Sequence, residues 1–123
     1  MNMQDIFIED VGSGTPLVLV HGFLGSSEMW TLQTDFFKKN FRVLAPALPG
    51  FGKSNKVNSC NSIEGMAKSI LTSLEKKKIE RFYLLGHSMG GMIVQEMAKL
   101  AGEKILKVNL LWYRTKRKYP WQI

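Results

Sequence analysis

The sequence contains few of the residues that build disulfides and metal sites. It has one cysteine, Cys60, and two histidines among 123 residues. One cysteine cannot form a disulfide within the chain, and so small a set predicts neither a metal cluster nor a metal cofactor. No apolar run of about 18 residues occurs, so no membrane-spanning helix is expected. The first residues show no basic segment followed by an apolar one, so we expect no signal peptide and a cytoplasmic location.

Positive charge is concentrated near the end of the chain. The formal net charge is +7. Four of the basic residues are Arg114, Lys116, Arg117 and Lys118. Such a cluster is typical of contacts with nucleic acid or an anionic membrane. The cluster lies in a segment, 109–123, that is aromatic and has no helix or strand periodicity.

Apolar runs that suit buried strands alternate with stretches that suit amphipathic helices. Strands are expected at 16–20, 41–48, 81–85 and 105–112, after a short β-rich segment at 6–8. Helices are expected at 28–39, 63–78 and 89–101. Gly102 is expected to end the last helix as a C′ residue. Continuous apolar runs suit strands buried on both faces, so the alternation predicts an α/β fold with a mostly parallel sheet and helices on both faces.

One short motif organises the chain. Gly86-His87-Ser88-Met89-Gly90 lies between an expected strand and an expected helix. In that context, a G-x-S-x-G motif places the serine hydroxyl on a sharp turn above a sheet, at the positive end of the next helix. The alternative is an ordinary turn in which Ser88 only caps the helix. The nucleophile interpretation predicts a positive φ at Ser88.

Three segments together resemble the N-terminal half of the α/β-hydrolase superfamily. They are His21-Gly22-Phe23, the stretch 46–54, and the motif around Ser88, each following an expected strand. The similarity covers roughly residues 4–108. It is greatest to the small esterase, haloperoxidase-like and C–C-bond hydrolase branches.

The resemblance implies a role for each matching position. Ser88 corresponds to the nucleophile, and the backbone N–H groups of Phe23 and Met89 to the oxyanion donors. Removing one such donor typically raises the barrier by about 3 kcal/mol. The remaining motif positions, which shape the surrounding loops, are His21, Gly22, Gly86, His87 and Gly90. Neither histidine is expected to be the catalytic base.

The acid and the base of the triad are missing from this sequence. In this superfamily, an aspartate or glutamate and then a histidine follow the nucleophile. No histidine follows His87, and the only acids after Ser88 are Glu96 and Glu103. Without a base, the serine hydroxyl is a weak nucleophile at neutral pH. We therefore expect a partial fold that lacks the C-terminal strands and lid, with the strand near 105–112 as an unpaired edge.

The segment 109–123 has a possible origin in a shifted reading frame. After a shift of one nucleotide, Trp112 followed by Tyr113 forces a glycine, as does Trp121 followed by Gln122. Permitted codons then give a peptide similar to a hydrolase continuation. We therefore divide the chain into 1–108, the N-terminal part of a hydrolase domain, and 109–123, a suspected frameshift product.

The sequence thus predicts a serine hydrolase core that acts on an ester, thioester or C–C ketone substrate and is weakly active or inactive by itself. The alternative is a non-catalytic remnant or binding protein that uses the same pocket. A partner chain that donates the missing half, or recruitment of His21 or His87, are further alternatives. We expect a small-molecule ester-like substrate and no cofactor, nucleic-acid or membrane partner, with the oligomeric state open.

Overall fold

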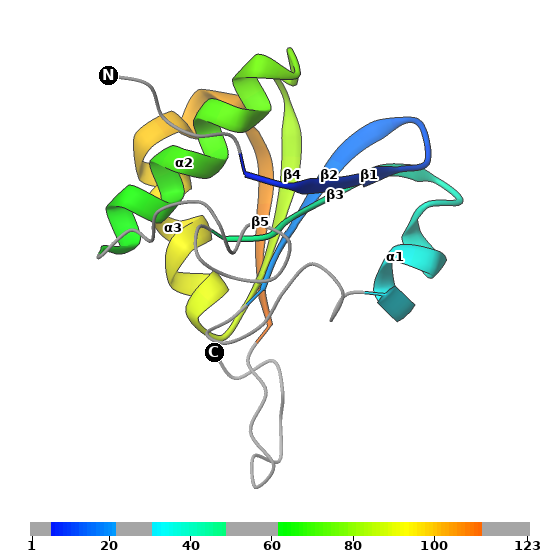
Figure 1. Ribbon diagram of the computed structural model, residues 1–123, viewed down its shortest axis with the longest axis horizontal. Helices are drawn as coiled ribbons and strands as arrows, with labels where there is room; N and C mark the ends of the chain where they lie inside the picture. Colours follow the sequence, from blue (N-terminus) through cyan, green and yellow to red (C-terminus); the bar gives the residue numbers. More distant parts are fainter. Residues whose placement is uncertain (1–5, 22–30, 49–61, 112–123) are drawn as a thin grey trace, which may run out of the picture.

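The computed structural model of the chain describes residues 6–21, 31–48 and 62–111. These residues form one five-stranded sheet with helices against both faces (Figure 1). In chain order the elements are β1 (Ile8–Val11), β2 (Thr15–Val20), α1 (Thr31–Phe37), β3 (Phe41–Pro46), α2 (Ile63–Lys76), β4 (Phe82–His87), α3 (Met89–Ala101), the 3-10 turn η3 (Gly102–Lys104) and β5 (Ile105–Leu111). None of the helices described is long and apolar enough to cross a membrane.

The sheet is parallel except at one edge. Its strand order is β1-β3-β2-β4-β5, and only β1 runs antiparallel to its neighbour. Val18 at the centre of β2 pairs with Leu44 of β3 on one side and Leu84 of β4 on the other. Because the central strands are parallel, β2, β3 and β4 all point their carboxyl ends to the same side of the sheet, where His21 follows β2 and Ser88 follows β4.

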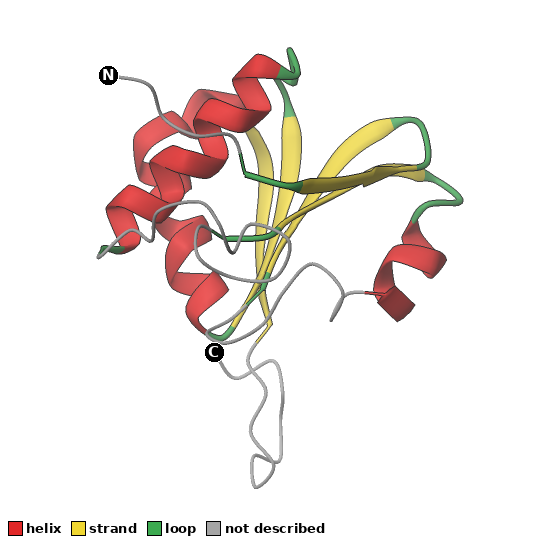
Figure 2. Ribbon diagram, in the orientation of Figure 1, coloured by secondary structure: helices red, strands yellow, loops and turns green. Residues whose placement is uncertain are grey.

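The two faces of the sheet are covered unequally (Figure 2). Helices α2 and α3 pack side by side on one face, and α1 lies against the other. The larger core lies under α2 and α3 and includes Val18, Val20, Leu44, Leu84, Ile70, Leu74, Ile93 and Met97. The smaller core under α1 is formed by Leu17, Leu19, Val43 and Ala45, with aromatic rings packed against it. The expectation of helices on both faces is confirmed.

Most predicted elements are present, with shifted ends. Ser62 caps α2 as expected, since its Oγ accepts a hydrogen bond from the N–H of Gly65 at 2.9 Å. Strand β4 ends two residues later than predicted, at His87, and β3 ends two residues earlier, at Pro46. Helices α1 and α2 end two residues before the predicted positions.

The predicted end of α3 at Ala101 is confirmed, but Gly102 does not have the conformation of a C′ residue. A C′ glycine adopts a left-handed conformation, but Gly102 has φ −57° and ψ −33° and continues into η3. The chain therefore leaves α3 through a tighter right-handed turn and enters β5 directly. The backbone conformation of Gly102 is one that any residue can adopt, so glycine is not required there.

Within the described residues, β5 is an edge strand. β5 pairs with β4 on one side and forms the edge of the described sheet. A β-bulge between Phe82 and Tyr83 of β4 leaves Leu106 without an opposite residue, and Leu106 is 39% exposed. The strand runs to Leu111, so residues 109–111 of the suspected tail belong to the sheet.

Candidate active site

Ser88 lies alone between a strand and a helix. β4 ends at His87 and α3 begins at Met89, so Ser88 is the whole connection. Its backbone has φ 58° and ψ −122°, which confirms the predicted positive φ. A residue with a Cβ in such a conformation stores about 1–3 kcal/mol of strain, which the surrounding structure must offset.

The hydroxyl of Ser88 does not cap the helix. Ser88 occupies the N-cap position of α3, yet its side chain makes no capping hydrogen bond. Its carbonyl oxygen instead accepts a hydrogen bond from the N–H of Gly91 at 2.8 Å. The residue is exposed. The structure therefore removes the simplest alternative to the nucleophile interpretation, in which Ser88 serves only as a helix cap.

Two glycines make this turn possible by close backbone contact. A Cβ at Gly86 would lie 2.5 Å from the carbonyl oxygen of Gly90. A Cβ at Gly90 would overlap the carbonyl oxygen of Val20, at the end of the neighbouring strand β2. A side chain at Gly86 would push β4 away from α3, and a side chain at Gly90 would push α3 away from the end of β2.

Helix α3 begins at Met89, directly after Ser88. As the first residue of α3, Met89 has an N–H group with no helical acceptor four residues earlier. The aligned peptides of the 13-residue helix place a partial positive charge at the same end. Two other predicted positions, Phe23 and Gly22, lie outside the described residues, as do Cys60 and residues 49–54 of the second motif.

His21 joins the ends of two strands. Its ring is fully buried just after β2. Its Nε2 accepts a hydrogen bond at 3.1 Å from the backbone N–H of Leu48, two residues after β3. The sequence motif indicated a loop-shaping role for His21 but not its partner. The pairing follows from the structure, in which β2 and β3 are parallel neighbours whose carboxyl ends lie side by side.

The two histidines of the sequence, His21 and His87, lie at the ends of β2 and β4. The Nε2 of His21 is engaged by Leu48. His87 precedes Ser88 directly as the last residue of β4, and its Nδ1 is buried whereas Ser88 is exposed. Glu96 is eight residues along α3, which corresponds to about 12 Å. The described part of the chain also contains no group of three or more potential metal ligands.

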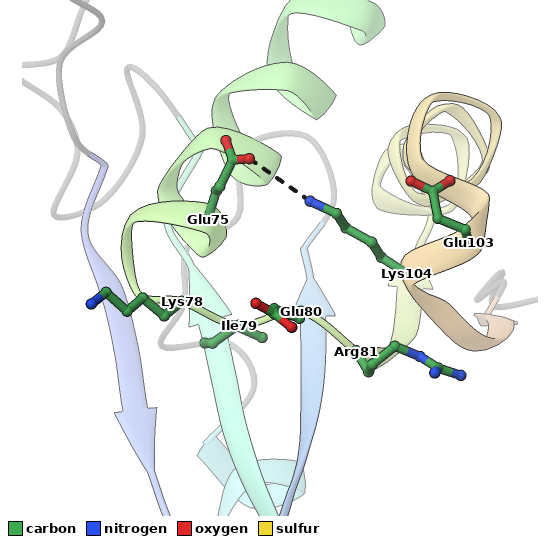
Figure 3. Close-up of a pocket in the computed structure, with 7 residues that line it drawn as sticks. All are labelled: Glu75, Lys78, Ile79, Glu80, Arg81, Glu103 and Lys104. Atoms are coloured by element: carbon green, nitrogen blue, oxygen red, sulfur yellow. Dashed lines mark ion pairs between the residues drawn. The ribbon is translucent and has the colours of Figure 1, made fainter.

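The hollow drawn in Figure 3 lies at the other end of the sheet. It measures about 380 Å³ and lies where α2 ends and β4 begins. The six residues of β4 separate it from Ser88 by about 20 Å. Three acidic and three basic side chains line it together with Ile79, and Lys104 Nζ lies 3.8 Å from Glu75 Oε2. Because its acidic and basic side chains balance and it is remote from the Ser88 turn, we assign it no part in the chemistry at Ser88.

This fold and this strand–serine–helix turn define the class of protein. The chain belongs to the family described as alpha/beta hydrolase fold, whose sequence pattern matches residues 15–111.

Comparisons with individual proteins agree with this family. The chain is 36% identical over 98 residues to the dihydrolipoyllysine-residue acetyltransferase component of the acetoin cleaving system of Pseudomonas putida, covering 80% of this chain and 26% of that protein. It is 31% identical over 108 residues to the AB hydrolase superfamily protein YisY of Bacillus subtilis, covering 86% and 40%.

Solved structures share the same arrangement of strands and helices. A thermophilic esterase from Thermogutta terrifontis superposes with a TM-score of 0.82 at 30% identity, covering 94% of this chain and 43% of that one. Est816, an N-acyl homoserine lactone degrading enzyme, gives a TM-score of 0.81 at 27% identity, covering 86% and 41%. The chain thus spans less than half the length of each of these relatives.

Proposed function

We propose that this chain provides the nucleophile half of a serine hydrolase active site. The observation that carries the proposal is the backbone of Ser88, strained at φ 58° between β4 and α3, with an exposed side chain that caps no helix. Strain of this kind persists where the surrounding structure holds it and is concentrated at functional sites. The solved relatives named as an esterase and as a lactone-degrading enzyme favour an ester among the possible substrates.

The proposed chemistry is acyl transfer to water. Ser88 Oγ attacks the carbonyl carbon of the ester while its proton passes to a base. The carbonyl oxygen becomes an oxyanion, which the N–H of Met89 and the positive end of α3 stabilise. The oxyanion then collapses and expels the alcohol, which takes a proton, and water hydrolyses the acyl-serine. No histidine follows Ser88 in the sequence to complete the triad, so we expect the unaided chain to be at most weakly active.

Added imidazole tests this proposal. Turnover of p-nitrophenyl acetate is measured for the chain and for Ser88→Ala over a series of imidazole concentrations. The Ser88→Ala variant measures hydrolysis by imidazole alone and by other side chains. We expect a small Ser88-dependent rate that rises with imidazole, because free imidazole takes the Oγ proton in place of the missing histidine.

Two other outcomes would contradict the proposal in different ways. Equal rates for both proteins at every imidazole concentration would favour the second candidate, a binding protein that keeps the fold without the chemistry. The observation that favours this candidate is that Nε2 of the buried His21 is occupied by Leu48. A Ser88-dependent rate near ~10 s⁻¹ without imidazole, typical of complete enzymes, would mean that another group serves as base.

A further inference from the structure

The Ser88 turn rests directly on the end of β2. A Cβ added to Gly90 would lie 2.6 Å from the carbonyl oxygen of His21 and still closer to that of Val20. In the sheet, Val20 pairs with Gly86, the other glycine of the turn. The backbone of residues 20 and 21 therefore forms the surface on which the turn packs. If this surface moved, Ser88 and the N–H of Met89 would move with it.

On its other side, His21 is bonded to the segment that directly follows β3. The ring of His21 is fully buried, and its Nε2 accepts the hydrogen bond from Leu48 N–H. Leu48 is itself fully buried, so its N–H would otherwise lack water as a partner. A buried donor left unsatisfied is unfavourable, which makes this bond a strong constraint on the spacing of the two strand ends. The acceptor role also requires that the proton of the neutral ring be on Nδ1.

We propose that His21 is a positioning residue for the Ser88 turn. It fixes the end of β2 to the end of β3, and the carbonyl groups of Val20 and His21 then support Gly90 and the start of α3. His21 touches neither the nucleophile nor the substrate in this scheme. The kinetic part of this inference rests on the function proposed above, whereas the structural part does not.

Two variants separate the hydrogen bond from the bulk of the ring. His21→Gln keeps an acceptor at a similar distance along the side chain, so its amide oxygen can take the bond from Leu48. His21→Leu fills much of the same space but accepts no hydrogen bond. For both variants, NMR measures the amide exchange of Leu48 and the amide shifts of residues 88–90. A separate assay measures the Ser88-dependent turnover of p-nitrophenyl acetate in the presence of imidazole.

The expected result is rescue by glutamine. His21→Leu exposes the Leu48 amide to exchange, shifts the amide resonances of residues 88–90, and lowers the Ser88-dependent rate by about tenfold or more, because small misplacements of reacting groups are costly. His21→Gln stays close to the parent chain in all three. If both variants matched the parent at residues 88–90, or if both disturbed them equally, the proposal would be overturned.

A third measurement needs no substitution. The ¹⁵N spectrum of the parent chain reports which ring nitrogen of His21 carries the proton. The proposal requires an unprotonated Nε2, and a protonated Nε2 would overturn it even if neither variant folds. Should turnover prove independent of Ser88, the function proposed above fails, while the exchange and ¹⁵N measurements still decide the role of His21.

Discussion

The carboxyl ends of β2, β3 and β4 and the outer edge of β5 are built very differently. At the strand ends, backbone groups lie so close that a single Cβ on Gly90 would overlap the carbonyl oxygen of Val20. At the edge, β5 has a strand on one side only within the described sheet, and Leu106 is 39% exposed. The comparison shows which part of a hydrolase site this chain specifies by itself. Its own packing determines the position of Ser88, the proposed nucleophile, while no histidine follows Ser88 in the sequence to serve as the base.

The largest effect is expected from a methyl group at the packed end. Gly90→Ala should destabilise the chain by about 3 kcal/mol, since the added Cβ meets rigid backbone that cannot move aside cheaply. Gly102→Ala is the matched control, because no atom lies within 4 Å of the added Cβ and its φ is −57°. We expect the control to be neutral or more stable by up to about 1 kcal/mol. Urea unfolding measures both, and equal midpoints would contradict the close packing.

Backbone strain at Ser88 should be released by removing its side chain entirely. Ser88→Gly is expected to raise the free energy of unfolding by about 1 kcal/mol, because glycine adopts φ 58° without the Cβ clash. Ser88→Ala keeps the Cβ and should show no such gain. Both variants lose the hydroxyl, so the difference between their unfolding midpoints isolates the backbone effect. A glycine variant no more stable than the alanine variant would argue against a strained turn.

Ser88 and Gly102 show how much of the local backbone structure can be predicted from the sequence alone. The G-x-S-x-G spacing between an apolar strand and an amphipathic helix was sufficient to predict the turn and the sign of φ at Ser88. The same local rules predict the end of α3 at Ala101 correctly, but the left-handed conformation typical of a C′ glycine is absent, because Gly102 is right-handed. Local pattern specifies a turn when neighbouring strands require it, and it misleads where the position is open to solvent.

Long-range contacts were beyond the sequence for a different reason. The bond from Leu48 to His21 joins residues 27 positions apart, and neither carries a signal that names the other. The bulge that displaces Leu106 depends on the register between β4 and β5, which apolar runs do not specify. The roles of Phe23 and Gly22 and the frameshift origin of 109–123 stay predictions, and the coding DNA tests the latter.

A smaller effect is expected at the antiparallel edge, far from β5. Arg42 donates to both carboxylate oxygens of Asp10, at 2.9 and 2.7 Å, and Lys77 donates to one at 3.2 Å. The hydrogen bonds from Arg42, and then from Lys77, lower the pKa of Asp10 against the opposing effect of its burial. Because these side chains are about a quarter to a third exposed, we expect Asp10→Asn to cost only about 0.5–1 kcal/mol at pH 7.

The pH dependence of that variant has a definite sign. A carboxylate whose pKa is lowered by folding stabilises the protein at any pH above the pKa of the unfolded state, here 3.8. This contribution is lost as the pH falls through the pKa of the folded state. The difference between the chain and Asp10→Asn should therefore be full at pH 7 and shrink below about pH 3.8. Asp35→Asn is the control, since its pair with Lys38 is largely exposed. A difference in stability that grew as the pH fell would contradict a lowered pKa of Asp10 in the folded chain.

The open edge should affect association more than stability. Leu106→Lys places a charge on the edge of β5 and is expected to lower self-association, with a change in unfolding free energy within about 0.5 kcal/mol. Leu100→Lys is the matched control, because Leu100 is 40% exposed but lies on α3 rather than on a strand edge. Sedimentation over a range of concentrations measures both. Equal effects of the two variants would mean that charge alone, and not the edge, governs association.

The most direct test of the whole account is the site of covalent labelling. The chain is incubated with a fluorophosphonate, with and without imidazole, and the modified residue is identified by peptide mass spectrometry. Attack by Ser88 Oγ on phosphorus expels fluoride, and the proton passes to imidazole. We predict a phosphonyl adduct on Ser88 that forms faster with imidazole and is absent from Ser88→Ala. Labelling that is no faster at Ser88 than at other hydroxyl groups, with or without imidazole, would contradict the claim that this chain presents a positioned nucleophile.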